Sequence, residues 1–234
     1  DAHNIFVSLA MTNREPSRSA YRDADPGVEI KPERLTDLEI GYVFSLSSFT
    51  LSTNVYYMKY KDQLVLTGKI NNVGAPIMQN VDNSYRTGIE LQTLWNVNKY
   101  FKWGFNTTLS ANKIQNFTAY VDDWDTWGVQ REESYDETDI SFSPSIIANN
   151  NFEFTPFNNF HINLISEYVG KQFIDNTSND QRSLNAYLVN NIRFNYSLET
   201  RLLKRIEFIL SLNNIFNETY ETNAWVYRYY YDNA

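Results

Sequence analysis

The chain has 234 residues, no cysteine, and 28 acidic against 20 basic side chains, which leaves a formal net charge of -8, while aromatic residues make up 16%. This aromatic content excludes an intrinsically disordered chain, the absence of cysteine excludes disulfides and Cys-ligated metal sites, and the acidic balance argues against nucleic acid as a partner. No apolar run exceeds four residues, so a membrane-spanning helix is excluded as well.

Alternation of apolar and polar residues is the strongest pattern along the chain. It begins at residues 4–12, where Ile5, Val7, Leu9 and Met11 share one parity and Ser8 has the other. This period of two is typical of a strand with one apolar face. The segments that show it are, in chain order, residues 4–12, 37–44, 49–57, 88–95, 101–110, 142–154, 160–168, 186–198 and 206–212. The sequence therefore predicts an all-β protein with nine strands and no helix.

The two faces of these strands differ in charge. Within the regular parts of the strands, the apolar parity carries no charged residue, although neutral polar residues interrupt it, among them Thr53, Thr93, Asn150, Ser166 and Asn190. The opposite parity is rich in charged and amide side chains. Such a division fits either a sandwich with a wet outer face or a barrel with lipid outside and water inside, and the alternation alone does not choose between them.

Loop lengths favour the barrel, because long and short connections alternate strictly. The long connections cover residues 13–31, 63–84, 115–140 and 171–185, with another after Asn217, and the short ones cover residues 45–48, 96–100, 156–159 and 199–205. In an up-and-down antiparallel sheet, this alternation places all long loops at one end. Short turns on one rim and long loops on the other are typical of outer-membrane barrels, whose long loops lie outside the cell.

Aromatic residues gather at both ends of the predicted strands. Near the short turns lie Tyr42, Phe44, Phe49, Trp95, Phe101, Trp103, Phe152, Phe154, Phe157, Phe160, Phe194 and Tyr196, and near the long loops lie Tyr56, Tyr57, Tyr60, Tyr168, Phe216 and Tyr220. Two such belts fit side chains at the two headgroup boundaries of a bilayer. We therefore expect outer-membrane lipids to contact the apolar face. An aromatic-rich core of a soluble protein is the alternative.

The predicted strand number does not close a barrel. Bacterial single-chain barrels have an even number of strands and no free edge, so nine strands predict an incomplete wall. No signal peptide precedes the first strand, and residues 1–4 lead directly into it. We therefore expect this chain to be part of a longer protein.

Several short motifs occur in the order in which one known family has them. They are Asn13-Arg14-Glu15-Pro16, Lys31-Pro32-Glu33-Arg34, Leu38-Glu39-Ile40-Gly41-Tyr42, Tyr60-Lys61-Asp62-Gln63-Leu64, Asn72-Val73-Gly74, Tyr85-Arg86-Thr87-Gly88-Ile89-Glu90, and Asn213-Asn214-Ile215-Phe216-Asn217 with Tyr220. Together they resemble the C-terminal half of the barrel of a TonB-dependent outer-membrane receptor. Leu38 stands where that family usually has an aromatic residue. The resemblance extends over nearly the whole chain.

The resemblance implies a 22-stranded barrel with a plugged lumen, of which residues 1–234 form a C-terminal portion. The plug domain, the earlier strands and the last strand would then lie outside this chain. It also implies a bacterial outer-membrane receptor, not an enzyme, that imports a ferric siderophore, haem, cobalamin or a glycan. The expected partners are the TonB complex, reached through the missing plug segment, and a surface lipoprotein. The side chains expected to face the lumen are Glu39, Glu90, Gln92, Asn106, Glu167 and Arg193.

The long loops contain the candidate ligand-binding residues. In residues 120–139, eight acidic side chains against Arg131 give a net charge of -7, and Trp124 and Trp127 lie among them. This segment is interpreted as a solvated acidic loop, with bound Ca²⁺ as the less favoured alternative because the spacing matches no EF-hand. The two tryptophans either stack on a ligand ring or sugar or pack against a neighbouring loop.

A second group of candidates combines aromatic and cationic side chains. It consists of Arg18, Tyr21 and Arg22 in the first long loop and of Trp225, Tyr227 and Tyr229 in the last. Together these residues are expected to form a vestibule for an anionic ligand such as an iron chelate, and packing at the rim is the alternative. The two histidines, His3 and His161, have no partner at metal-ligand spacing, and no phosphate loop or nucleophile elbow is present.

Three other functions stay open at this point. A passive porin would conduct ions without an energy source, and a soluble β-rich module, for example one that binds glycans, would be a monomer without detergent. An outer-membrane enzyme is the third, and the absence of a catalytic motif disfavours it.

Overall fold

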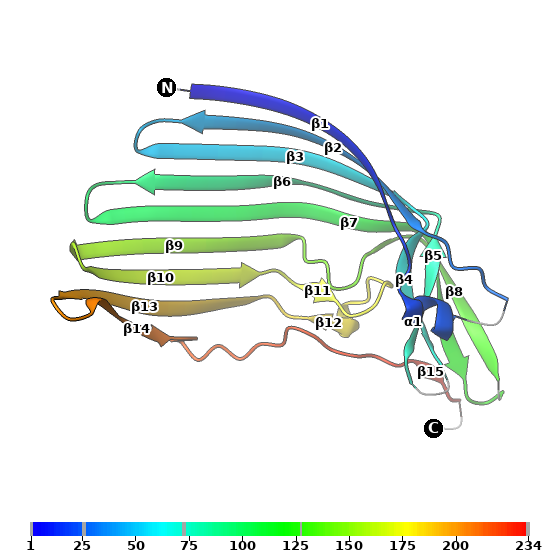
Figure 1. Cartoon of the computed structure of the whole chain (residues 1–234). Helices are drawn as coiled ribbons and strands as arrows, with labels where there is room; N and C mark the ends of the chain where they lie inside the picture. The colour runs from blue at the N-terminus through cyan, green and yellow to red at the C-terminus, as the bar shows by residue number, and fades with distance from the viewer. Residues whose placement is uncertain (1, 25–26, 72–73, 127, 233–234) are drawn as a thin grey trace.

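The main body of the molecule is one curved antiparallel sheet (Figure 1). The computed structural model describes residues 2–24, 27–71, 74–126 and 128–232. Nine strands follow one another across the sheet, and they are β1 (Ala2–Arg14), β2 (Glu33–Ser45), β3 (Phe49–Lys61), β6 (Asn83–Asn96), β7 (Phe101–Asp123), β9 (Ile146–Phe157), β10 (Phe160–Val169), β13 (Tyr187–Thr200) and β14 (Lys204–Leu212). These are the nine predicted strands, so the prediction of an all-β, up-and-down wall is confirmed. The sheet is not closed, because β1 and β14 form its two edges.

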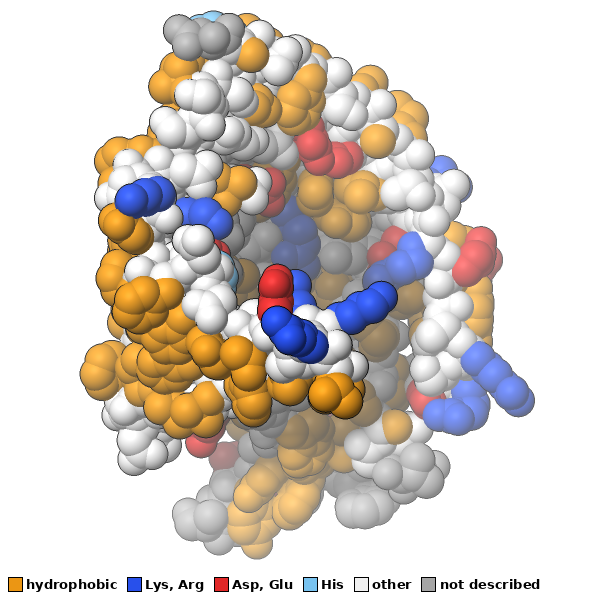
Figure 2. Space-filling view, turned by 60° about the vertical axis from the view of Figure 1, so that its left-hand side comes forward, with side chains coloured by type: hydrophobic (Ala, Val, Ile, Leu, Met, Phe, Trp, Pro, Cys, Tyr) orange, Lys and Arg blue, Asp and Glu red, His pale blue; other side chains and the backbone are white. Residues whose placement is uncertain are grey.

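Strand register aligns the apolar residues in rows across the sheet. One row runs from Ile40 through Val55, Ile89 and Leu109 to Ile146, each opposite the next. Most side chains on this face are exposed, with Ile40 at 51% and Val55 at 48%. Figure 2, turned toward the short-turn end, shows hydrophobic side chains over the outer surface and charged side chains within the hollow. This is the distribution expected when lipid replaces water as the outer solvent.

The long loops are more structured than the sequence predicted. Residues 63–81 form a hairpin of β4 (Gln63–Ile70) and β5 (Pro76–Val81), and β8 (Val129–Asp139) pairs with the far half of β7. The remaining loop elements are two short strands, β11 (Gln172–Phe173) and β12 (Ser183–Leu184), the 3-10 helix η1 (Asp180–Arg182) and β15 (Tyr229–Tyr230). All of them lie at the end of the sheet opposite the short turns (Figure 1).

The prediction that the chain has no helix was wrong, because the first long loop contains α1 (Arg18–Asp23). Ser17 caps this helix by accepting a hydrogen bond from the Ala20 amide at 3.2 Å, and Ala20 packs with Ile30 and Leu64. A helix of six residues with one buried residue leaves no apolar period in the sequence. Neither α1 nor any other helix in the described part of the chain has the length and apolar composition needed to span a membrane.

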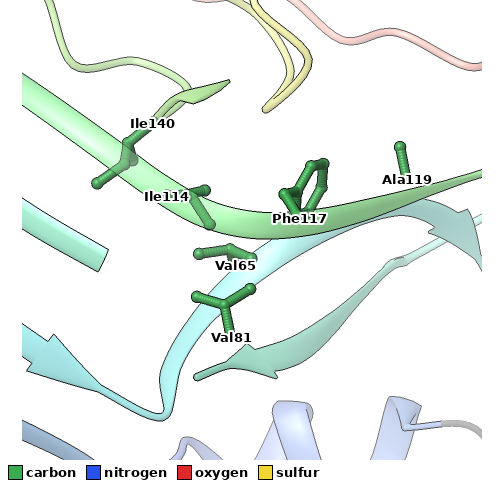
Figure 3. Packing of buried hydrophobic residues seen from close by; sticks show 6 residues of the cluster. All are labelled: Val65, Val81, Ile114, Phe117, Ala119 and Ile140. Carbon is green, nitrogen blue, oxygen red and sulfur yellow. The ribbon is translucent and has the colours of Figure 1, made fainter. Parts of the chain in front are cut away.

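The hydrophobic core lies at the long-loop end and not within the wall. It consists of Val65, Val81, Ile114, Phe117, Ala119 and Ile140 (Figure 3). Ile114 and Phe117 are at most 1% exposed. Because β4, β5, the far half of β7 and Ile140, directly after β8, supply these side chains, the loops form a packed cap on one end of the sheet.

One predicted strand begins later than the sequence indicated. Residues 142–154 were expected to form a strand, but β9 begins at Ile146 and Phe142 has a φ of 51°. Non-glycine residues adopt this left-handed region mainly in turns. Phe142 therefore lies in a turn beside the cap.

Candidate functional site

The last described residues cross the cap and bind to the acidic hairpin β7–β8. We name residues 224–232 the C-terminal strap. Its β15 pairs in parallel with β7, with Tyr229 opposite Asp122. The Trp124 amide donates to the Tyr230 carbonyl at 2.9 Å, and the Trp124 and Tyr229 rings are stacked with their centroids 4.2 Å apart. The strap is thus fixed to the hairpin by both backbone and ring contacts.

Glu133 is the main polar anchor of the strap. Its carboxylate accepts hydrogen bonds from Arg228 Nη1 at 2.6 Å and from the Tyr230 and Tyr135 hydroxyls, each at 2.8 Å. Burial by itself raises the pKa of Glu133, but these three donors outweigh burial, so the pKa lies below its usual range. The Arg228 side chain is only 14% exposed. The ion pair between Arg228 and Glu133 joins two segments that lie 95 residues apart in sequence.

A second set of polar contacts ties the loop around residue 175 to the cap. Asp175 Oδ2 accepts a hydrogen bond from Arg182 Nε at 2.6 Å and lies 3.8 Å from Arg228 Nε. Asn176, which is 1% exposed, accepts from the Ser141 amide at 2.7 Å and donates to the Leu66 carbonyl at 2.9 Å. Buried amides that satisfy two backbone groups hold a loop in one conformation.

Between β4, β7, the 171–177 loop and the strap lies a pocket with about 630 Å³ of empty space, its open mouth included. Most of its lining is apolar. The lining residues are Leu66, Thr67, Gly68, Lys69, Ile70, Pro76, Phe117, Ala119, Phe142, Ile174, Asp175, Asn176, Thr177, Ala224, Trp225, Val226 and Arg228. The Lys69 ammonium lies 3.9 Å from the centroid of the Tyr120 ring. The lining thus carries two cations, Lys69 and Arg228, and one carboxylate, Asp175, while Arg228 also pairs with Glu133. A mainly apolar wall with a few charged groups suits a ligand that carries a ring or chain together with a charged group.

The predicted ligand residues fall into two groups. Four of them, Trp124, Trp225, Tyr227 and Tyr229, lie together along the strap, where Trp124 Nε1 and the Tyr227 hydroxyl are 3.1 Å apart. The other three, Arg18, Tyr21 and Arg22, lie on α1, which packs against β5. Trp127 lies outside the described residues. Binding of a ligand by these side chains stays a prediction.

Several residues that build the site were not among the candidates. Arg228, Glu133, Asp175 and Phe117 form or fix the pocket. The sequence interpretation counted Glu133 only among the acids of the 120–139 loop and Arg228 only within the 225–231 segment of the expected vestibule, and it assigned Asp175 and Phe117 no role. One signal for Phe117 was present, since Phe117, Ala119 and Val121 alternate with polar residues and are all buried. The pairing of Arg228 with Glu133 left no local signal, because it depends on where two distant loops meet.

The acidic hairpin uses several of its carboxylates in ion pairs and hydrogen bonds. Asp123 accepts from Arg131 Nε at 2.7 Å, and this bond holds the pKa of Asp123 below its usual range. Asp139 lies 2.7 Å from Lys113 Nζ. Within the described ranges, no three His, Asp or Glu side chains form a group able to hold a metal ion. Calcium binding in this loop stays a prediction.

The residues predicted to face the lumen share the polar face of the wall. Glu39 accepts from Asn54 Nδ2 at 3.3 Å, Asn106 accepts from Asn149 Nδ2 at 3.3 Å, and Arg193 Nε donates to Ser211 at 3.3 Å. The other three, Glu90, Gln92 and Glu167, are exposed. Contact of any of them with a plug or a ligand stays a prediction.

We expect acid to release the strap. Because the pKa of folded Glu133 lies below its unfolded value, its stabilisation is complete above the unfolded pKa of about 4.3 and is lost as the pH falls through the folded value. Near-UV circular dichroism of the intact protein should therefore lose the signal of the stacked Trp124 and Tyr229 below about pH 4. Glu133→Gln should make this acid transition much smaller. The remaining transition would come from Asp123, whose pKa also lies below its usual range. An unchanged acid transition in this variant would contradict the assignment.

Comparisons with known proteins agree with this architecture. The model of the family described as "TonB dependent receptor-like, beta-barrel" matches residues 1–217. The solved siderophore receptor PiuA from Acinetobacter baumannii has 16% identity and a TM-score of 0.72 over 95% of this chain and 31% of its own. The ferric yersiniabactin uptake receptor FyuA from Yersinia pestis has 16% identity and a TM-score of 0.66, over 97% of this chain and 32% of its own.

A third solved structure, the copper transporter OprC, has 14% identity and a TM-score of 0.68 over 93% of this chain and 32% of its own. The search of curated proteins gives no match. The chain spans about a third of the length of these solved structures, and at such identity they show the shared fold. Proteins of the matched family are receptors and transporters of the bacterial outer membrane, not enzymes. The chain therefore belongs to the TonB-dependent receptor β-barrel family.

Proposed function

We propose that this chain is the C-terminal part of the barrel of a receptor that imports a scarce nutrient across the outer membrane with energy from the TonB complex. The open edges at β1 and β14 support a longer barrel, because an unpaired strand edge exposes backbone polar groups that lipid does not satisfy. In this proposal the plug, the earlier strands and the last strand complete the barrel. The polar face with Glu39, Glu90 and Arg193 then contacts the plug or lines the lumen.

The observation that carries the ligand proposal is the apolar pocket between the cap and the strap, with Arg228 and Lys69 in its lining. It supports a ligand that combines an aromatic ring or aliphatic chain with negative charge. A ferric siderophore fits this description better than a glycan, which is neutral and polar. PiuA and FyuA are named as a siderophore receptor and a ferric yersiniabactin uptake receptor.

Filling the pocket tests the site. Ala224 lines the pocket, and in the full-length receptor Ala224→Phe should weaken the best ligand of a panel of ferric catecholates, ferric hydroxamates, haem and cobalamin about ten-fold or more, equal to ~1.4 kcal/mol. Binding is measured by quenching of tryptophan fluorescence. Thr222→Phe, an exposed position outside the lining, is the matched control and should bind normally. Equal ligand affinities of the two variants would show that the pocket is not part of the binding site.

Energy dependence tests the transport class. Cells that carry the full-length receptor should bind the ligand but fail to import it when TonB is deleted or a protonophore is added. Uptake that continues under both conditions, together with ion conductance of the purified barrel, would favour a passive porin. A chain that stays monomeric in buffer without detergent would favour a soluble binding module.

A further inference from the structure

The short turn between β13 and β14 exposes apolar side chains to an unusual degree. Leu202 is 94% exposed and Leu203 is 65% exposed, and Leu202 has the highest value among the large apolar side chains of the described residues. Arg201 precedes this pair and Lys204 follows it. Two adjacent leucines between two cations form an amphipathic tip at the short-turn rim.

The turn holds this tip in a defined conformation. Thr200 pairs with Lys204 across the hairpin, and the Leu203 amide donates to Thr200 Oγ1 at 3.0 Å. Lys204 has a φ of 54°, in the left-handed region where glycine or asparagine carries less strain. The backbone conformation therefore does not itself favour lysine at this position.

The tip continues the apolar outer face of the wall. Tyr196 pairs with Phe208 and Leu198 with Ile206, and these four side chains have the same parity as the other outward apolar residues. A strand that rises about 3.3 Å per residue and tilts about 45° places Thr200, the last residue of β13, roughly 5 Å beyond Leu198 along the membrane normal. The turn residues 201–203 extend beyond Thr200, so the tip lies at the rim of the apolar face.

The two cations are available to an external anion. No ion pair or hydrogen bond of the Arg201 or Lys204 side chain is found within the part of the chain that the structure describes. Arg205, in contrast, has inward parity, where it contacts Glu207 at 2.5 Å and Ser197 Oγ at 3.1 Å. Arg201 and Lys204 thus differ from Arg205 in lacking an internal carboxylate.

The other short turns lack this combination. Each exposes an apolar side chain, namely Leu46 at 39%, Val97 at 38% and Phe157 at 69%. Lys99 is the one cation in those turns, and its ammonium lies 4.7 Å from the centroid of the Tyr100 ring. Among the four turns, only residues 201–204 join two exposed leucines to cations on both sides.

We propose that residues 201–204 form a binding surface for anionic phospholipid in the leaflet next to the short turns. The leucines enter the boundary between headgroups and acyl chains, and Arg201 and Lys204 bind the phosphate groups. Cations near an anionic membrane surface each increase the attraction about five-fold, and their apolar stems extend along the same boundary. The proposal rests on the outer-membrane barrel of the proposed function and on the expected position of the short turns at the inner rim, but not on ligand import.

Local lipid contact tests this surface directly. A fluorophore is attached to Leu202→Cys in the intact receptor, made otherwise free of cysteine and reconstituted in bilayers with lipids brominated on the acyl chain. We expect strong quenching by both brominated lipids. Because the site has two cations, its preference for phosphatidylglycerol over phosphatidylcholine, measured from the quenching, should be roughly ten-fold or more. In Arg201→Ser/Lys204→Ser this preference should fall to near unity. The control Lys31→Ser/Lys61→Ser makes the same charge change at the exposed opposite rim and should keep it.

Heat-modifiable gel mobility confirms that each variant contains a folded barrel. A fluorophore that no brominated lipid quenches would overturn the proposal, since the tip would then lie in periplasmic water. If the two brominated lipids quench the parent receptor equally, Arg201 and Lys204 do not select anionic lipid, and this part of the proposal is wrong. If the fluorophore at residue 202 becomes shielded from water only after a periplasmic extract is added, the tip binds a protein partner and not lipid. Loss of import with lipid contact retained would contradict the proposed function alone.

Discussion

Replacing Gly88 by alanine should lower the free energy of unfolding of the full-length receptor by about 3 kcal/mol, or prevent the wall from forming. A Cβ atom at this position would lie 2.4 Å from the Leu109 carbonyl oxygen and 2.7 Å from the Tyr56 hydroxyl. Tyr56 faces Gly88 across the β3–β6 pair and is 8% exposed. The ring therefore occupies the space that a side chain would need, and the clash with the backbone of β7 leaves no room for relaxation.

Gly104→Ala, on the adjacent strand β7, is the matched control. Its Cβ would meet Leu94 Cδ2 at 3.5 Å, an ordinary contact, so we expect a change within about 0.5 kcal/mol. Urea titration and heat-modifiable gel mobility in lipid measure both variants. Equal stability of the two would show that the close approach at Gly88 relaxes without loss. The same geometry gives a physical reason for glycine in the Gly88-Ile89-Glu90 segment.

Arg228→Ala should free the C-terminal strap from the acidic hairpin. The variant removes a charged donor 2.6 Å from Glu133 and leaves that half-buried carboxylate with two tyrosine donors. A hydrogen bond between charged groups contributes about 2 kcal/mol, which corresponds to a roughly 30-fold faster local opening. Hydrogen exchange of the Tyr229 and Tyr230 amides should accelerate by this factor, and chymotrypsin should cut at the strap.

Arg205→Ala provides the control for this experiment. Its ion pair with Glu207 is exposed on both sides, at 62% and 52%, and exposed pairs contribute at most about 1 kcal/mol. We expect exchange at the strap to be unchanged in this variant. If Arg228→Ala also left the exchange unchanged, the aromatic and backbone contacts would be sufficient to hold the strap.

The wall could be predicted from the sequence because each of its strands separates two solvents. Residues such as Ile40 and Glu39 face opposite sides, so the period of two is retained wherever lipid and water lie on the two faces. The pattern fails where this condition ends. In β8, 11 residues contain only Val129 and Tyr135 as large apolar side chains, and the alternation that marks the wall is absent.

The cap could not be predicted for a second reason, which lies in β7. Its buried parity changes from even at Asn112 and Ile114 to odd at Phe117 and Ala119, around Asn116 with a φ of 53°. A single left-handed residue thus exchanges the two faces, and a search for unbroken alternation ends there. The strand continues to Asp123, although residues 115–140 were interpreted as a loop.

The arrangement of the candidate ligand residues could be predicted in part, while ligand binding itself stays a prediction. Aromatic side chains in loops predicted the contact surfaces around Trp124 and Tyr227, because exposed rings need a partner. The prediction that α1 joins them into one vestibule depended on where the loops lie relative to each other. That arrangement comes from distant pairs such as Asn176 with Leu66, 110 residues apart, for which neither residue gives a local signal.

The position of the core at one end of the sheet has a consequence for the order of assembly. The bonds between Arg228 and Glu133 close a segment of 95 residues, and such distant closures are slow and entropically costly compared with hairpin formation. The adjacent hairpins of the wall are local and can form early, whereas the pocket needs residues 224–228 to reach the cap. The pocket is therefore completed after the hairpins of the wall, and removal of residues 224–232 would take away one of its sides.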